Sequence, residues 1–250
     1  MRTVVATRYV TPFREGGSLP GLVEADDDGL YVVKFRGAGQ GPRALIAELV
    51  AGEVARALGL RVPELVLVEL DPRIAPAEPD PEIQDLLRAS AGLNIGLDFL
   101  PGSLPYNPLD PPSAELAAEV VWFDALVLNV DRTPRNPNLL RWHDELWLID
   151  HGASFFRHHR ADDRKWDAAA AAREPFPAIS EHVLIDGAAP LSTVDERLAS
   201  RLDASVLQRI GALVPAAWGD ADAYVEFLGA RLRAPRPFVD EADRARDAVG

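Results

Sequence analysis

Three side chains with hard oxygen atoms lie close together in the second half of this 250-residue sequence: Asp131, Asn136 and Asp150. Two apolar runs, Asn138–Trp142 and Leu146–Asp150, flank a short polar turn, a pattern that is typical of a β-hairpin. A hairpin returns the chain to its starting point, so Asp150 at its end should meet Asn136 at its beginning. Asp131 precedes Asn136 on the same loop and should reach the same place. The spacing therefore predicts that two carboxylates and one amide converge at the open end of the hairpin.

Carboxylate and amide oxygens are the ligands that Mg²⁺ prefers. Magnesium takes few protein ligands and fills its other positions with water and substrate phosphate. The set therefore predicts a magnesium–phosphate site in which Asp131 is free to orient a nucleophilic hydroxyl. Each of these residues alone is also a common turn residue, so the combined spacing carries the argument. Asn138 is an alternative amide ligand, but we prefer Asn136 because of its spacing.

Two further readings of this region stay open. His151, His158 and His159 together with Asp150 suggest a metal hydrolase, although adjacent histidines point in different directions on regular structure. Arg132 and Arg135 are suited either to hold a phosphate or a peptide acceptor, or to pair with nearby acidic residues.

The segment Asn129-Val130-Asp131-Arg132, followed by Asn136 and then by Ile149-Asp150-His151-Gly152, resembles the catalytic loop and metal-binding segment of HipA-like kinases. A more distant resemblance is to phosphatidylinositol 3- and 4-kinases. The resemblance implies a protein-kinase-like fold in which Asp131 orients the acceptor hydroxyl, while Asn136 and Asp150 hold Mg²⁺. Val130 before the aspartate and His151 after Asp150 depart from the eukaryotic protein-kinase pattern and favour the HipA-like branch.

The same resemblance implies a strand lysine that contacts the α- and β-phosphates and a helix glutamate that pairs with it. Lys34 stands in the apolar run Tyr31–Phe35, and a charge inside a buried strand normally needs a partner. Glu48 falls on the inward side of the helix predicted to begin near Pro42, beside its apolar row. Glu53 is the alternative partner.

The phosphate-covering loop and the adenine-contacting segment are assigned by their positions in the sequence. The resemblance implies that Gly16, Gly17 and Ser18 form a loop over the phosphates, because they connect the strands that precede Lys34. It further implies that the segment Asp98, Phe99 and Leu100 joins the two lobes and contacts adenine, by its backbone and by the side chains of Phe99 and Leu100.

Before residue 100 the patterns are mostly strands with one main helix, and after it they are mostly helical. This order indicates an α+β fold; together with the resemblance it predicts a bilobal protein-kinase-like fold, with a β-rich N-lobe over residues 1–100 and a mostly helical C-lobe over 101–250. The proline-rich segment Asp71–Pro81 is expected to be a surface loop or an insertion, and the charged tail after Pro237 is expected to be frayed. We expect strands at Arg8–Phe13, Leu30–Phe35 and Leu65–Val68, a strand that runs into a linker at Leu97–Gly102, and helices from Pro42 to Gly59, from Ser113 to about Val130, at Ser205–Leu213 and at Ala221–Leu232.

Composition limits the partners. With 26 basic and 39 acidic residues the net charge is −13, which argues against a general nucleic-acid binder. The absence of cysteine excludes thiolate chemistry and disulfides. No apolar run is long enough for a membrane span and the first residues lack a signal-peptide pattern, so we expect a cytoplasmic protein.

We therefore interpret the chain as an ATP- and Mg²⁺-dependent phosphotransferase of the HipA-like type that moves the γ-phosphoryl group to a hydroxyl, with protein Ser/Thr as the favoured acceptor. The alternatives are a lipid or small-molecule kinase, a nucleotide-binding pseudokinase or sensor without phosphotransfer, and an enzyme that transfers AMP.

Overall fold

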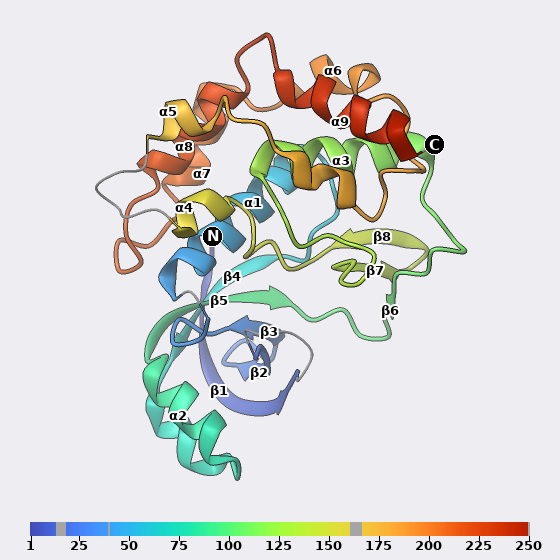
Figure 1. Cartoon of the computed structure of the whole chain (residues 1–250). Coiled ribbons are helices and arrows are strands. Elements are labelled where there is room, and N and C mark those ends of the chain that lie inside the picture. The colour runs from blue at the N-terminus through green and yellow to red at the C-terminus, as the bar shows by residue number, and fades with distance from the viewer. Residues whose placement is uncertain (14–18, 40, 161–166, 250) are drawn as a thin grey trace.

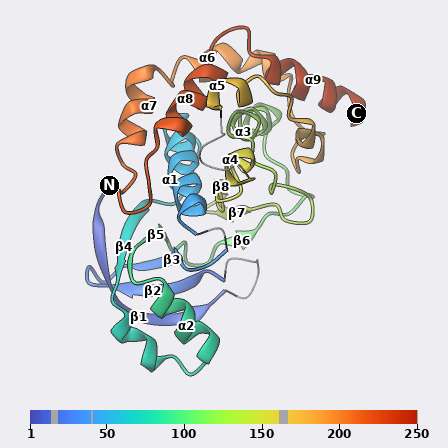
Figure 2. The same ribbon diagram turned by 60° about the vertical axis from the view of Figure 1, so that its left-hand side comes forward.

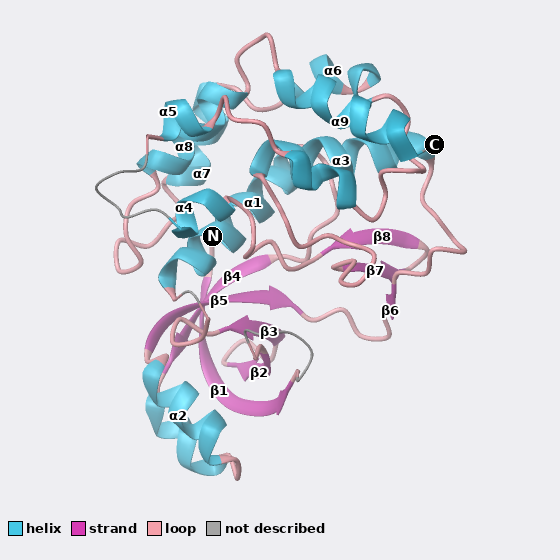
Figure 3. Cartoon of the chain, viewed as in Figure 1, coloured by secondary structure: helices cyan, strands magenta, loops and turns pink. Residues whose placement is uncertain are grey.

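The computed structural model describes residues 1–13, 19–39, 41–160 and 167–249. Most strands lie in the lower part of the molecule together with one helix, and most helices lie in the upper part (Figures 1 and 3). The chain is thus a mixed α+β protein, as the distribution of strand and helix patterns along the sequence predicts.

The first five strands form a closed barrel in the order β1-β2-β3-β5-β4. The parallel pairing of β1 with β4 closes it, and the other neighbours are antiparallel. Side chains that alternate along the strands, such as Val23, Val33 and Val68, fill its interior. Strand spacing predicts individual strands but not this closure. The strands are β1 (Thr3–Pro12), β2 (Gly21–Ala25), β3 (Leu30–Lys34), β4 (Leu65–Leu70) and β5 (Gly92–Asp98).

Helix α1 (Pro42–Ala57) connects the barrel to the helices. Pro42 stands in its first turn, where the missing N–H is not needed, and Gly59 follows it with a φ of +85°, a conformation that suits glycine. Residues on several faces of α1 are buried, because it packs against β4 and β5 on one side and α7 (Ala204–Gly211) on another. Glu48 is therefore carried on a helix that is enclosed on several sides.

The segment after β4 corrects one expectation. The expected loop or insertion at Asp71–Pro81 contains a short 3₁₀ helix, η1 (Pro72–Ala77), and its last residue is the first residue of α2 (Pro81–Ala89). Asp71 and Asp80 each accept a hydrogen bond from a main-chain N–H two residues later, and a proline opens each helix. Pro72 and Pro81, two of the four prolines that suggested irregular structure, are thus helix starts.

The helical half begins with α3 (Ala114–Val127), whose N-cap is Ser113: its Oγ accepts a hydrogen bond from the N–H of Leu116 at 3.2 Å. After α3 the chain forms the predicted hairpin, and Figure 2 shows α3 and α1 close to it. The remaining elements are β6 (Leu104–Pro105), β7 (Leu139–Trp142), β8 (Glu145–Leu148), α4 (Phe156–Arg160), α5 (Ala168–Ala171), η2 (Pro177–Glu181), η3 (Leu191–Thr193), α6 (Asp195–Ala199), α8 (Asp222–Arg231) and α9 (Pro237–Val249).

The C-terminal segment corrects a second expectation. It is not frayed but forms α9, with Phe238, Val239 and Ala242 buried. The ring of Phe238 lies 5.5 Å from that of Trp122 on α3, and Asp243 accepts a hydrogen bond of 2.6 Å from the N–H of Leu191. The apolar residues of α9 recur at helical spacing, but the many charged residues between them obscure this pattern in the sequence.

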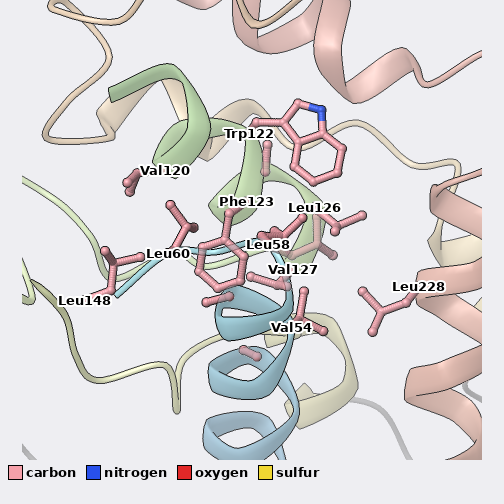
Figure 4. Packing of buried hydrophobic residues seen from close by; sticks show 14 of the residues in the cluster. Val54, Leu58, Leu60, Val120, Trp122, Phe123, Leu126, Val127, Leu148 and Leu228 are labelled. Atoms are coloured by element: carbon pink, nitrogen blue, oxygen red, sulfur yellow. The ribbon is translucent and has the colours of Figure 1, made fainter. Parts of the chain in front are cut away.

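The larger hydrophobic core includes α1, α3 and most of the later helices, as well as side chains from β4 and β5. Figure 4 shows Phe123 and Val127 of α3 packed over Val54 of α1 and over Leu58, which follows that helix, with Leu148 of the hairpin at the edge. This core therefore spans both sides of residue 100. No helix in the described part of the chain is long and apolar enough to cross a membrane.

Candidate active site

The β7–β8 hairpin aligns the ends of its two strands. His143 and Asp144 both have positive φ, as a tight two-residue turn requires, and Leu139 pairs with Leu148. Beyond the strands, the N–H of Ile149 donates to the carbonyl of Asn138 at 3.1 Å. Asn138 therefore lies opposite the residue that immediately precedes Asp150.

Asp131 is held by the asparagines around it. The Nδ2 groups of Asn136 and Asn138 both donate to Asp131 Oδ2, at 2.9 and 3.2 Å. Asn138 also donates to the Asp131 carbonyl at 3.0 Å, and the Asp131 N–H donates to Oδ1 of Asn129 at 3.1 Å. Because Asn136 uses its amide nitrogen on Asp131, its Oδ1 is the atom that can face a cation.

Lys34 brings a third part of the chain to this place. Its Nζ donates to Glu48 Oε2 at 2.5 Å and also to Asp150 Oδ1. Glu53, the alternative partner, instead faces Arg56 at 3.6 Å. The ammonium group thus joins β3, α1 and the segment that follows β8, so Lys34, Glu48 and Asp150 form one cluster.

Burial and neighbouring charges shift the pKa values of Lys34 and Glu48 in opposite directions. Burial alone would lower the pKa of Lys34, but the carboxylates of Glu48 and Asp150 raise it above its usual range. Burial alone would raise the pKa of Glu48, but the Lys34 ammonium outweighs it and the pKa falls to about 2. Both groups are therefore charged at neutral pH.

The lowered pKa of Glu48 predicts a stability change with pH. The ordinary pKa is 4.5 and the folded value is about 2, so the stabilisation is complete above pH 4.5 and is lost as the pH falls towards 2. We expect the free energy of unfolding of the Glu48→Gln variant to depend less on pH in this window than that of the wild type. Urea denaturation at several pH values measures the difference, and parallel pH profiles would contradict it.

His151 and His158 have other neighbours than a shared metal site at Asp150. The His151 ring is buried 5.7 Å from that of Phe123, with Nδ1 3.5 Å from Glu48 Oε1, whereas the His158 ring packs on Tyr224 at 4.4 Å. Across the described residues, no group of three or more His, Asp or Glu side chains is arranged to hold a metal ion. The hydrolase reading therefore lacks the ligand cluster that it needs.

The predicted adenine segment lies at the end of β5. The N–H of Asp98 donates to the Glu64 carbonyl and that of Phe99 to the Leu30 carbonyl, both at 2.9 Å, so these two donors are engaged within the barrel. Leu100 is buried and Phe99 is half-buried. The predicted phosphate loop, Gly16, Gly17 and Ser18, lies outside the described residues.

A buried ion pair behind Asp131 decides between the two interpretations of Arg132 in favour of pairing with an acidic residue. Arg132 does not face outward to hold phosphate: its Nε donates to Asp124 Oδ2 at 2.5 Å, and both side chains are fully buried. Burial would raise the pKa of Asp124, but the Arg132 guanidinium and then His182 lower it below its usual range. The signal was present, because Asp124 interrupts the apolar run from Val120 to Val127 of α3.

Comparison with known proteins bears on the family and on the fold. A family model described as HipA-like kinase matches residues 7–225. The chain is also similar to the crystal structure of a Helicobacter pylori proinflammatory kinase, CtkA, with a TM-score of 0.57 and 13% sequence identity over 100% of this chain and 99% of that one. No curated protein matches the chain. The structural likeness supports a shared fold.

Proposed function

The chain belongs to the HipA-like kinase family, and on that premise we propose that it transfers the γ-phosphoryl group of ATP, with Mg²⁺, to a hydroxyl acceptor. The observation that carries this proposal is the meeting of Lys34, Glu48 and Asp150, which come from three separate parts of the chain. A protein Ser/Thr hydroxyl is the acceptor that the family favours.

The donor set fits a magnesium ion that is shared with phosphate. Asp150 supplies a carboxylate and Asn136 an amide oxygen, and both are hard ligands. Two protein ligands suffice, because Mg²⁺ is commonly completed by water and phosphate oxygens. When bound, the ion would neutralise negative charge on the β- and γ-phosphates.

The other residues act on the substrates. Lys34 has three N–H donors, of which Glu48 and Asp150 take two, and the third is proposed to bind a phosphate oxygen. Asp131 accepts a hydrogen bond from the acceptor hydroxyl and points it at the γ-phosphorus. Asn138 is bonded to both the main chain and the side chain of Asp131, so we assign it to positioning that carboxylate and leave the metal to Asn136.

The two halves of the chain have different roles in the proposed phosphotransfer. The barrel and α1, within residues 1–100, act as the ATP-binding lobe, and residues 101–250 carry the catalytic loop and the metal ligands. Gly16, Gly17 and Ser18 are proposed to cover the phosphates. The adenine is proposed to lie against the segment Asp98–Leu100, where Phe99 and Leu100 offer apolar contact.

The test uses purified wild type and the Asp131→Ala variant. Mg-ATP should raise the melting temperature of both, because Asp131 does not hold the nucleotide. Only the wild type should transfer label from γ-labelled ATP to itself, to a protein or to an alcohol, and we expect the variant to be slower by at least about 10²-fold.

Parallel assays with α-labelled ATP separate the competing functions. Transfer of the α-label to an acceptor would indicate that the enzyme transfers AMP rather than the γ-phosphoryl group. Binding without transfer to proteins, lipids or small alcohols would favour a nucleotide sensor. The absence of any Mg-ATP-dependent shift in melting temperature would contradict the nucleotide site itself.

A further inference from the structure

His182 lies about fifty residues beyond Asp131 in the sequence, yet it contacts the support of the catalytic loop. Its Nε2 is 2.8 Å from Asp124 Oδ2, and its Nδ1 accepts a hydrogen bond from the N–H of Leu184 at 3.1 Å. An Nδ1 that accepts cannot carry a proton, so the proton is on Nε2. His182 thus donates through Nε2 to the buried Asp124 carboxylate.

That carboxylate has three side-chain partners. Besides His182, Asp124 accepts from Arg132 Nε at 2.5 Å and from Asn129 Nδ2 at 2.9 Å. The main chain adds a further link, because the N–H of Val183 donates to the Arg132 carbonyl at 3.0 Å. All four side chains of this cluster, which are Asp124, Asn129, Arg132 and His182, are at most 4% exposed.

Arg132 links this cluster by hydrogen bonds to the catalytic loop and to the segment that contains Asp150. Its Nη1 donates to the carbonyl of Asn138 and, at 3.4 Å, to that of Ile149. Asn138 carries the amide that holds Asp131, and Ile149 immediately precedes Asp150. The guanidinium group therefore spans the gap between the catalytic loop and the metal-binding segment.

We propose that His182 is a positioning residue for phosphotransfer. It acts through Asp124 and Arg132 to fix the position of Asp131 relative to Asp150. This inference rests on the proposed function. Loss of the Nε2–H donor removes one of the three partners of Asp124, and the Asp124–Arg132 pair can then shift within its pocket. A shift of about 1 Å between reacting groups can cost about 10²-fold in rate.

Two amide substitutions separate the two ring nitrogens of His182. In His182→Gln the amide nitrogen can take the place of Nε2 and still donate to Asp124. In His182→Asn the amide oxygen can take the place of Nδ1 and keep the Leu184 bond, but no donor reaches Asp124. We expect His182→Asn to lower kcat about tenfold or more, and His182→Gln to stay within about threefold of the wild type. The KM for ATP should stay within about twofold in both variants, because neither touches Lys34 or Glu48.

Hydrogen exchange provides a readout that does not need activity. We expect the amides of residues 129–139 to exchange faster in His182→Asn than in the wild type, and His182→Gln to resemble the wild type. Equal kcat in all three proteins would overturn the proposal, as would equal losses of kcat and of melting temperature in both variants. If the wild type transfers no phosphate, the proposed function fails, and selective loosening in His182→Asn alone still supports the positioning of the loop.

Discussion

Replacing Asp150 with alanine is expected to lower kcat for phosphotransfer by at least about 10³-fold. Asp150 is the carboxylate that touches Lys34, and it is the proposed charged ligand of Mg²⁺. Its removal leaves Asn136 as a single neutral ligand and removes negative charge beside the ammonium group. The loss should fall mainly on kcat, because Lys34, paired with Glu48, remains to bind the nucleotide.

The measurement is the initial rate of γ-label transfer at several Mg²⁺ concentrations. Asp150→Asn keeps the size of the side chain and removes the charge, so it should lose nearly as much activity as the alanine variant. Asp85→Ala is a suitable control, because Asp85 is exposed on α2 and only pairs with Arg88 on the same helix. Retention of more than about a tenth of the activity by Asp150→Ala would be incompatible with a metal-ligand role.

Replacing Asp124 with alanine is expected to reduce the free energy of unfolding by about 3–5 kcal/mol. Both charges of the Asp124–Arg132 pair are completely buried, so the change would leave the Arg132 guanidinium without its counter-ion. It would also remove the partner of His182 and of the Asn129 amide. Chemical denaturation with urea measures the loss, provided that a single transition is seen.

A double variant separates the buried charge from the missing volume. In Asp124→Ala/Arg132→Met no unpaired charge remains, so part of the lost stability should return relative to Asp124→Ala alone. A loss of less than about 1 kcal/mol in Asp124→Ala would mean that Arg132 finds another partner or water. Equal stability of the single and double variants would assign the loss to the cavity alone.

Local patterns predicted many elements correctly. Pro42 and Gly59 bound the first main helix, Ser113 caps the second, and the apolar runs around His143–Glu145 form a hairpin. In each case the signal depends on neighbours within a few residues: a fixed φ, a side-chain oxygen near free N–H groups, or alternation of apolar side chains. Such short-range effects act before the chain is packed.

The errors arose where packing decides between local options. Proline is compatible both with a loop and with the first turn of a helix. Asp71 and Asp80 can cap a helix, but the helical conformation is favoured only when Ile83 and Leu87 are buried in the hydrophobic core. The tail after Pro237 is too charged to indicate a buried face, but α3 supplies the surface on which Phe238 packs. Closure of the barrel needs β1 to meet β4, about sixty residues away, and no local pattern encodes that contact.

The sequence by itself determined which groups are available and placed Asp131, Asn136 and Asp150 around one hairpin, because only short stretches of chain separate them. It also put Lys34 on a strand and Glu48 on the next helix. Tertiary structure decided that Lys34 reaches Asp150, 116 residues away, and that Asp124, Arg132 and His182 share one buried site. The reason is that a buried charge is tolerated only beside its counter-charge, and the counter-charge can come from anywhere that folding brings close.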